Sequence, residues 1–337
     1  MIGLDIGSKT IKVVELEKER TGFRLKASGI VGYKSNSPDH LTDEKELVVM
    51  SDVIRKLFKE VKINSNEVIV SLPENQVFTR LVKFPFLTDS EIASAVKWEA
   101  EQYIPFPVEE AVIEHQILDR KEDATPPQVF VLLIAAPKTL VEKYVKLAEM
   151  AKLKVLAVET ELMALARSIC PVDQTVLAVD FGARCTNIAI VRNAYLMMSR
   201  SIPTAGDALT RAVAQGLGIE AQQAEEYKKT YGLSEARLEG KIKGVLDPVL
   251  RMVADEMRKA IHYYSAEGEG DPPKSVVISG GTATMPDVVG VMTNLLGMEV
   301  VVGNPFSKIQ IDPQAAKNLM GYAPLYSIAV GLAMRIA

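Results

Sequence analysis

The fold is decided by residues 1–16, which read Met1-Ile2-Gly3-Leu4-Asp5-Ile6-Gly7-Ser8-Lys9-Thr10-Ile11-Lys12-Val13-Val14-Glu15-Leu16. Apolar side chains alternate up to Ile6, the Gly7-Ser8 pair interrupts them, and the alternation resumes at Ile11, which predicts a strand, a tight turn and a second strand. Asp5 ends the first strand, and Gly7 lets backbone N–H groups approach an anion. The turn therefore has the residues to hold a phosphate, with Asp5 beside a hydrated metal ion.

The same pattern returns halfway along the chain. Residues 175–191 again give an apolar strand, an Asp-x-Gly turn at Asp180 and an alternating strand. The copies differ by one residue in the turn, since Thr10 follows Asp5 by five positions and Thr186 follows Asp180 by six. A single such turn is most often only a turn, because Asp hydrogen-bonds its own backbone and Gly supplies positive φ. The second copy indicates that the fold starts again in the second half.

Length and composition describe a globular α/β protein of about two domains. The chain has 337 residues, of which 48% are hydrophobic and 24% charged, and its mean hydropathy is +0.10. Its net charge of −4 gives no overall electrostatic case for binding nucleic acid or an anionic bilayer. Cys170 and Cys185 match no metal-ligand spacing, which favours a reduced, cytoplasmic protein.

No membrane segment is expected from the sequence. The N-terminus is already a strand, without the basic and apolar regions of a secretory signal. The longest apolar runs are too short for a bilayer span. We therefore expect any association with a membrane to go through a partner.

The stretch between the two duplicated turns contains a different unit. Thr88-Asp89-Ser90-Glu91 is a capping box that opens a helix ending at Tyr103, and strand-like segments lie on both sides of it. An amphipathic helix is expected over 138–152. The single tryptophan, Trp98, is expected in the core. These elements predict a small inserted α/β subdomain.

The remaining elements predict a second half that parallels the first. A helix follows Gly206, a second carries Glu225 and Lys228, and a long helix is expected to start at Asp247-Pro248, with proline at its first position. A buried strand then ends at Gly280-Gly281. A closing helix is expected over 324–336.

This order of elements resembles the actin, Hsp70 and sugar-kinase class, an α/β fold with duplicated ribonuclease H-like halves that hold a nucleotide between two phosphate loops. We expect residues 1–76 and 157–175 to form the first actin-like half and 77–156 to form the inserted subdomain. The second half is expected over 176–320. Residues 321–337 are expected to be a closing helix that returns to the first half.

Within that class the chain resembles the PilM family, the actin-like proteins of type IV pilus assembly and relatives of the division protein FtsA. The resemblance covers nearly the whole chain and includes Ser71-Leu72-Pro73, the run 99–106, and Gly303-Asn304-Pro305-Phe306. It implies binding of ATP with Mg²⁺ and capture of the cytoplasmic N-terminal tail of PilN by a groove that involves the inserted subdomain. It also implies a place at the inner face of the bacterial inner membrane, in contact with pilus motor ATPases and in a ring.

The resemblance and the duplicated turns together define the expected site. Asp5 and Asp180 are expected to bind Mg²⁺ through water. Glu225 and Lys228 lie one helical turn apart and resemble the family's ribose and adenine contacts, with a surface ion pair as the alternative. For Lys9 the alternative is an ordinary exposed turn lysine. The residues expected to contact nucleotide are Gly7, Ser8, Lys9, Thr10, Gly182, Ala183, Arg184, Thr186, Gly206, Glu225, Lys228, Gly280, Gly281 and Thr282.

Hydrolysis would need an acceptor that aligns water on the terminal phosphate. Glu159 is the candidate, because related ATPases place a polar residue at this strand end, and Glu161 is its near rival. An acid that caps a helix start is an equally good explanation of both. PilM-like proteins are at most slow ATPases, so whether this chain is an enzyme stays open.

Two other functions fit the same superfamily. One is a filament-forming cytoskeletal ATPase like FtsA or MreB. FtsA carries an amphipathic membrane helix after a linker, and no such segment follows the closing helix in this sequence. The other is a small-molecule kinase, although those enzymes usually have a larger sugar-binding insertion and a catalytic Asp in the cleft.

Overall fold

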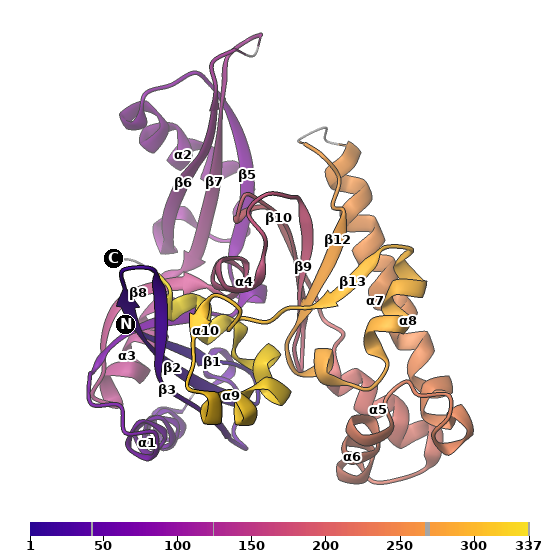
Figure 1. Cartoon of the computed structure of the whole chain (residues 1–337). Helices are drawn as coiled ribbons and strands as arrows, with labels where there is room; N and C mark the ends of the chain where they lie inside the picture. Colours follow the sequence, from indigo (N-terminus) through magenta and orange to yellow (C-terminus); the bar gives the residue numbers. More distant parts are fainter. Residues whose placement is uncertain (42, 124, 267–269, 336–337) are drawn as a thin grey trace.

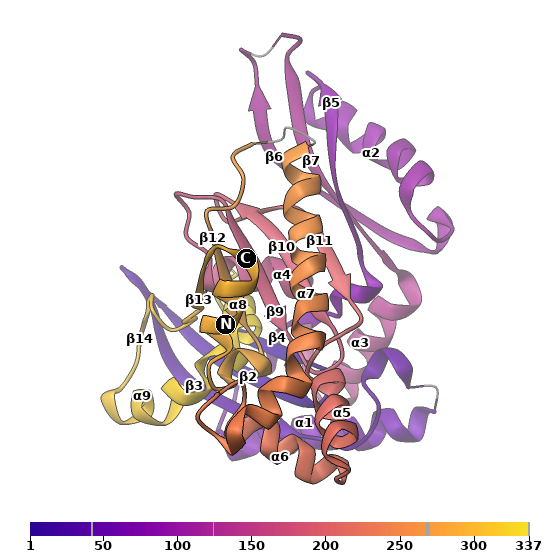
Figure 2. The same cartoon turned by 90° about the vertical axis from the view of Figure 1, so that its right-hand side faces the viewer.

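The computed structural model describes residues 1–41, 43–123, 125–266 and 270–335. Figure 1 shows two lobes side by side and a strand-and-helix unit that projects from one end. The last segment of the chain, drawn in yellow, returns to the lobe that contains the N-terminus, and Figure 2 shows the same parts after a quarter turn. Within the described residues, no helix is both long and apolar enough to cross a membrane.

The first half is a six-stranded sheet. Its strands are β1 (Ile2–Ile6), β2 (Thr10–Glu19), β3 (Gly22–Gly32), β4 (Glu67–Leu72), β8 (Lys154–Thr160) and β14 (Ile309–Gln310). They lie in the order β14-β3-β2-β1-β4-β8. Strand β1 pairs antiparallel with β2 and parallel with β4, and all five of its residues are buried. The turn at Gly7 therefore projects from the middle of the sheet.

The second half repeats this arrangement. Its strands are β9 (Val176–Phe181), β10 (Thr186–Arg192), β11 (Tyr195–Ile202), β12 (Ser275–Ser279) and β13 (Glu299–Val302). They lie in the order β11-β10-β9-β12-β13. Strand β9 pairs antiparallel with β10 and parallel with β12, as β1 does with β2 and β4. The duplication expected from the two Asp-x-Gly turns is confirmed.

Helices form three layers around the two sheets. The outer face of the first sheet is covered by α1 (Glu44–Glu60) and α3 (Lys138–Met150). The second sheet is covered by α5 (Gly206–Leu217), α6 (Ala221–Tyr231), α7 (Lys241–Ala266) and α8 (Val288–Leu296). Between the sheets lie α4 (Glu161–Ile169) and α10 (Ser327–Ala333), and α9 (Pro313–Leu319) lies near them (Figure 1).

Two glycines set the spacing of the central layer. A Cβ atom on Gly3 would lie 2.1 Å from the carbonyl oxygen of Ala329, and one on Gly331 would lie 1.8 Å from that of Ala164. Glycine therefore lets β1, α10 and α4 approach backbone to backbone. Helix α10 also contacts the second half, because Ile328 and Leu332 share a core with Val176 and Val277 of the second sheet, so the closing helix joins the two halves.

The projecting unit is the inserted subdomain. It contains β5 (Phe78–Pro85), α2 (Asp89–Tyr103), β6 (Ala111–Lys121) and β7 (Gln128–Pro137). The three strands form an antiparallel sheet in the order β5-β7-β6, and α2 buries Ile92, Val96 and Ala100 against it. The capping box is present: Thr88 N donates to Glu91 Oε2 at 2.8 Å, and Glu91 N donates to Thr88 Oγ1.

The packing places two segments differently from the expected domain boundaries. Helix α3 and the first three residues of β8, which the boundary at 156 assigned to the inserted subdomain, pack with the first half, because Leu140 and Leu147 lie in its core and β8 extends its sheet. By packing, the insertion therefore ends at Pro137. The return to the first half begins near Phe306, earlier than residue 321, since β14 and α9 already belong there.

Three expectations for single residues and ends differ from the structure. Trp98 is 74% exposed, because it lies on the face of α2 opposite Ile92, Val96 and Ala100. Pro248 is inside α7, which begins at Lys241. The closing segment is the short helix η6 (Met320–Tyr326) followed by α10, and the expected helix end at Ile336 lies outside the described residues.

Candidate functional site

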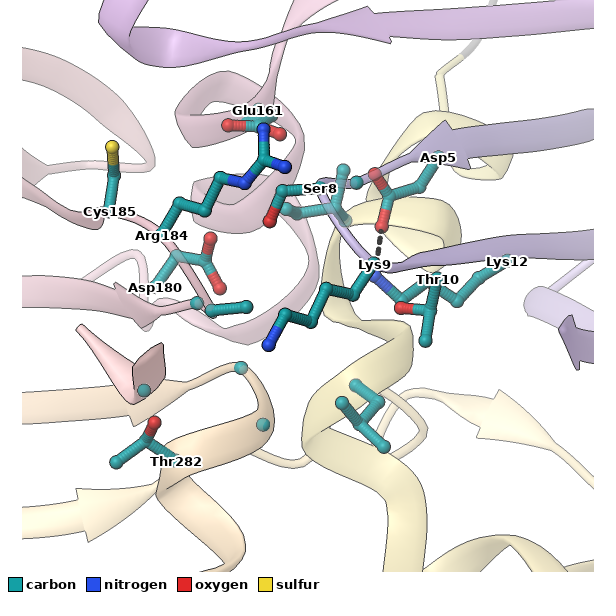
Figure 3. A pocket seen from close by; sticks show the side chains of 18 of the residues that line it. Asp5, Ser8, Lys9, Thr10, Lys12, Glu161, Asp180, Arg184, Cys185 and Thr282 are labelled. Carbon is teal, nitrogen blue, oxygen red and sulfur yellow. Dashed lines mark hydrogen bonds and ion pairs between the residues drawn. The ribbon is translucent and has the colours of Figure 1, made fainter. Parts of the chain in front are cut away.

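The two Asp-x-Gly hairpins face one another across a single cavity of about 850 Å³ (Figure 3). The β1–β2 hairpin of the first half forms one wall, and the β9–β10 hairpin of the second half forms the other. The cavity brings together nearly all residues that the sequence predicted: Asp5, Gly7, Ser8, Lys9, Thr10, Asp180, Gly182, Ala183, Arg184, Gly206, Glu225, Lys228, Gly280, Gly281 and Thr282.

Two predicted residues do not line this cavity. Glu159 is held by Arg167, whose Nη1 donates to Glu159 Oε2 at 2.9 Å and whose Nη2 bonds Oε1. Thr186 is fully buried, and its hydroxyl donates to the carbonyl oxygen of Thr204 at 2.7 Å. Since β8 ends at Thr160, Glu159 belongs to the strand and the next acid along the chain, Glu161, reaches the cavity instead.

Glu161 lies at the first position of α4 and points into the cavity (Figure 3). Its Oε2 accepts hydrogen bonds from the backbone N–H of Glu74 and from Asn187 Nδ2, both at 3.1 Å. Burial, and then the negative charges of Asp180 and Asp5, raise the pKa of Glu161 well above its ordinary value. The side chain is therefore fixed by the first half and the second half at once.

Sequence reasoning missed one residue of the first hairpin, Lys12. Its Nζ lies 3.0 Å from Asp5 Oδ2 (Figure 3). On the other side of the carboxylate, Ser71 Oγ lies 3.4 Å from Asp5 Oδ1. Burial lowers the pKa of Lys12, but the Asp5 carboxylate outweighs it, so the pKa is raised and Lys12 stays charged. The available signal was a lysine inside an apolar strand, two residues after Thr10 and so on the same face.

Asp180 stands on the opposite wall of the cavity. Burial raises its pKa to about 6; the charge of Lys12 opposes this shift and Asp5 adds to it. No group of three or more His, Cys, Asp or Glu side chains fit to hold a metal ion is present in the described ranges. Two aspartates at a phosphate loop nevertheless suit Mg²⁺, which keeps most of its water and takes only one or two carboxylates plus phosphate oxygens.

The loop that follows β12 requires glycine. Gly280 has a φ of +83°, and a Cβ atom there would lie 2.6 Å from the carbonyl oxygen of Phe181 and 2.7 Å from Asp180 Oδ1. The loop therefore packs directly on the second hairpin. From the other side, Gly206 N donates to Gly182 O at 3.1 Å, and Asp207 N donates to Ala183 O at 2.8 Å. The second hairpin is thus held in place by two neighbouring segments.

Buried Lys228 and half-buried Glu225 form one corner of the cavity. Lys228 Nζ bonds Glu225 Oε2 at 2.6 Å, Thr210 Oγ1 at 2.8 Å and the carbonyl oxygen of Gly206 at 3.0 Å. Burial raises the pKa of Glu225, but hydrogen bonds from Lys228 and Thr210 lower it to about 2. Glu225 is therefore negatively charged, while burial lowers the pKa of the Lys228 ammonium that it pairs with. Next to it, Met285, Tyr322 and Leu325 give the cavity an apolar end that the sequence did not predict.

Comparisons with known proteins agree with this geometry. The chain in a solved PilM-PilN type IV pilus biogenesis complex is 26% identical, with a TM-score of 0.85 over 99% of this chain and 97% of that one. FtsA of Bacillus subtilis is 23% identical over 363 residues, which are 93% of this chain and 80% of FtsA. MreB5 of Spiroplasma citri bound to AMPPNP is 14% identical, with a TM-score of 0.56 over 98% of this chain and 93% of that one, and shares the fold.

A family model described as type IV pilus assembly protein PilM matches residues 3–337, which is almost the complete sequence. The match includes both hairpins, the inserted subdomain and the closing segment. The chain therefore belongs to the PilM family of type IV pilus assembly proteins.

Proposed function

We propose that this chain is an ATP-binding adaptor of the type IV pilus assembly complex, located in the cytoplasm at the inner face of the inner membrane. The observation that carries the proposal is the meeting of two duplicated Asp-x-Gly hairpins across one cavity. Each hairpin supplies a carboxylate, a glycine and a cation, so the cavity has donors for phosphate and acceptors for a hydrated cation on both walls.

Different residues of the cavity would contact the different parts of a nucleotide. Lys12, Lys9 and Arg184 would bind the phosphates together with the backbone of the two hairpins. Asp5 and Asp180 would hold Mg²⁺ through water, and the ion would supply charge neutralisation between phosphate oxygens. The loop at 280–282 and the apolar end of the cavity would receive the nucleoside, beside the Glu225–Lys228 corner.

Turnover, where it occurs, is expected to be slow. Glu161, rather than Glu159, is the carboxylate placed to accept a proton or a hydrogen bond from water in the cavity. Its Oε2 already accepts two hydrogen bonds, from Glu74 N and Asn187 Nδ2. An acceptor that is engaged in this way leaves only its second oxygen for water. We therefore propose that the site binds ATP to set a conformation more than to consume it.

The partner that we propose is the cytoplasmic N-terminal tail of PilN. The likeness to the chain of the PilM-PilN complex supports this assignment, at 26% identity over nearly the full length of both chains. Binding of that tail would bring the protein to the membrane and connect the platform to the motor ATPases. Self-association into a ring is part of the same proposal.

Calorimetry with a synthetic peptide of the PilN tail from the same organism tests this proposal. We expect a 1:1 complex in the presence of ATP and Mg²⁺, and no heat with a scrambled peptide of the same composition. Absence of binding both with and without nucleotide would remove PilN as the partner.

A second candidate is an FtsA-like filament. It is favoured by the match to Bacillus subtilis FtsA over 93% of this chain. Sedimentation distinguishes the two functions, because ATP-dependent polymers that pellet at micromolar protein would support a filament, whereas a single slow-sedimenting species supports the adaptor.

A further inference from the structure

We propose that the nucleotide cavity is mechanically coupled to the inserted subdomain through both places where the chain crosses between that subdomain and the first half. The inbound crossing is the short helix η2 (Glu74–Gln76), which leads from β4 into β5. The outbound crossing is the junction of β7 with α3 at Pro137 and Lys138. The inference rests on the proposed binding of nucleotide in the cavity.

The inbound crossing is tied to Glu161 by two reciprocal hydrogen bonds. Glu161 Oε2 accepts from the backbone N–H of Glu74 at 3.1 Å, and Glu74 Oε2 accepts from the backbone N–H of Leu162 at 3.4 Å. Glu74 is 3% exposed, so these bonds do not compete with bulk water. Any displacement of the Glu161 carboxylate within the cavity is therefore passed to the residues that begin the inserted subdomain.

The outbound crossing is tied to Arg184 through one intermediate segment, the short helix η1 (Pro38–His40). Arg184 Nη1 donates to Ser37 Oγ at 3.0 Å, which joins the second hairpin to the residue just before η1. On the other side of η1, Lys143 Nζ donates to the carbonyl oxygens of Leu41 at 3.0 Å and Asp39 at 3.5 Å. Lys143 belongs to α3, the helix that continues directly from β7.

A bound phosphate acts on both ties in a defined direction. Arg184 and Glu161 line the same cavity (Figure 3). Phosphate oxygens attract the Arg184 guanidinium more strongly than the neutral Ser37 hydroxyl does, because charge-assisted hydrogen bonds are roughly twice as strong as neutral ones. The same charge disfavours a negative charge on Glu161, as Asp180 and Asp5 already do. A ligand that binds one of two conformations more favourably shifts the equilibrium toward that conformation.

Hydrogen–deuterium exchange of the full chain, with and without AMPPNP and Mg²⁺, measures the coupling. We expect AMPPNP to slow exchange in the hairpins at 7–10 and 182–186. We also expect exchange at 73–78 and at 138–146 to change by at least about threefold. Because Pro73, Asn75 and Tyr144 of these segments also line the cavity, the variants below distinguish coupling from direct contact with nucleotide.

Lys143→Met breaks the outbound tie and keeps the length of the side chain. We expect the AMPPNP-dependent change at 138–146 to disappear, while the hairpins stay protected and the affinity for AMPPNP stays within about twofold of wild type. Lys146→Met is the matched control, because Lys146 lies one turn further along α3 and pairs with Glu44 instead of η1. This control should behave as wild type.

Glu74→Met tests the inbound tie independently. It removes the acceptor for Leu162 N and leaves the bond from the backbone N–H of Glu74 to Glu161 Oε2, so the change at 73–78 should be reduced while that at 138–146 is kept. Wild-type behaviour of both Lys143→Met and Glu74→Met would overturn the coupling. If the hairpins of the wild type are protected and both crossings are unaffected, only the coupling fails. If AMPPNP protects neither hairpin in the wild type, the proposed nucleotide binding fails with it.

Discussion

The two hairpins of the cavity share the same strand pairing and differ in the residue that lies across from the aspartate. In the first, the residue directly across from Asp5 on the neighbouring strand is Lys12, and the two side chains form a buried ion pair. In the second, the residue across from Asp180 is Asn187, whose amide is directed to Glu161. At equivalent positions of the duplicated halves, Asp5 therefore has a lysine that neutralises its charge, whereas Asp180 faces an asparagine.

We propose that this difference gives the two aspartates separate roles. The pKa of Asp180 is raised to about 6, because burial and Asp5 disfavour its charge more than Lys12 favours it. Asp180 thus gains most from an added cation, and the second hairpin is the wall on which we place Mg²⁺ first. The Asp5–Lys12 pair instead presents an ammonium group beside the proposed phosphate positions.

Lys12→Met is expected to have the largest effect, because it leaves the buried Asp5 carboxylate without its cation. We expect a loss of roughly 3–5 kcal/mol in the free energy of unfolding, the range for breaking one partner of a buried ion pair. Urea denaturation at neutral pH without nucleotide measures it. Lys9→Met is the matched control on the same hairpin: Lys9 is 52% exposed, and its loss should cost less than about 1 kcal/mol.

The double variant Asp5→Asn, Lys12→Met completes this test. Without either charge, most of the lost stability should return, because no uncompensated carboxylate stays buried. Equal losses for the Lys9 and Lys12 variants would show that the two lysines do not differ in the way described.

Asp180→Asn is expected to stabilise the folded chain at high pH, whereas Lys12→Met destabilises it. An acid whose pKa is raised to about 6 on folding holds a proton between pH 4 and 6 that the unfolded chain releases, so wild-type stability falls as pH rises through this window and is level above it. The asparagine variant lacks this dependence. Because Asp180 is only partly shielded from the cavity's water, we expect it to be more stable than wild type by about 1–2 kcal/mol at pH 8 and about equal at pH 4.

Thermal unfolding of nucleotide-free protein at several pH values checks this result. Asp5→Asn provides the comparison, since removing the partner of Lys12 should destabilise the chain at pH 8. A variant of Asp180 that is less stable than wild type at high pH would contradict the proposed difference between the hairpins.

The smallest effect on stability is expected from the ion pair at the rim of the cavity, where the two halves meet. Lys9 forms an exposed ion pair with Asp207 across the mouth of the cavity. Asp207→Asn should change the unfolding free energy by less than about 1 kcal/mol and should reduce the salt dependence of nucleotide binding only slightly. Binding titrations at low and high salt measure this, and a large change would mean that the rim contributes more than the buried Lys12.

Much of the fold was predictable because its signals are local. The alternating strands around Asp5 and Asp180 fix both hairpins, and the Thr88–Glu91 capping box fixes the start of α2. The side on which a helix packs is a property of the assembled structure, which is why α3 was assigned to the insertion. Trp98 was expected inside on its residue type, whereas the phase of Ile92, Val96 and Ala100 puts it outside.

Site residues that act through their backbone were predictable from the sequence. Residues whose role depends on the direction of the side chain were less predictable. Glycines at 7, 182 and 280 mark the loops from the sequence alone. Glu159 and Thr186 lie near the right loops but point elsewhere, into contacts with Arg167 and Thr204 that only the packed structure shows. Lys12 carries a buried charge whose partner becomes visible through the pairing of β1 with β2.

The most direct test of the central claim is a calorimetric titration of ATP with Mg²⁺ into the wild type and the Asp180→Asn variant. We predict one saturable site per chain for the wild type, and an affinity at least about tenfold weaker for the variant, which lacks a carboxylate at the proposed cation site. Folded wild-type protein that shows no saturable binding, or a variant that binds as tightly as wild type, would contradict the account.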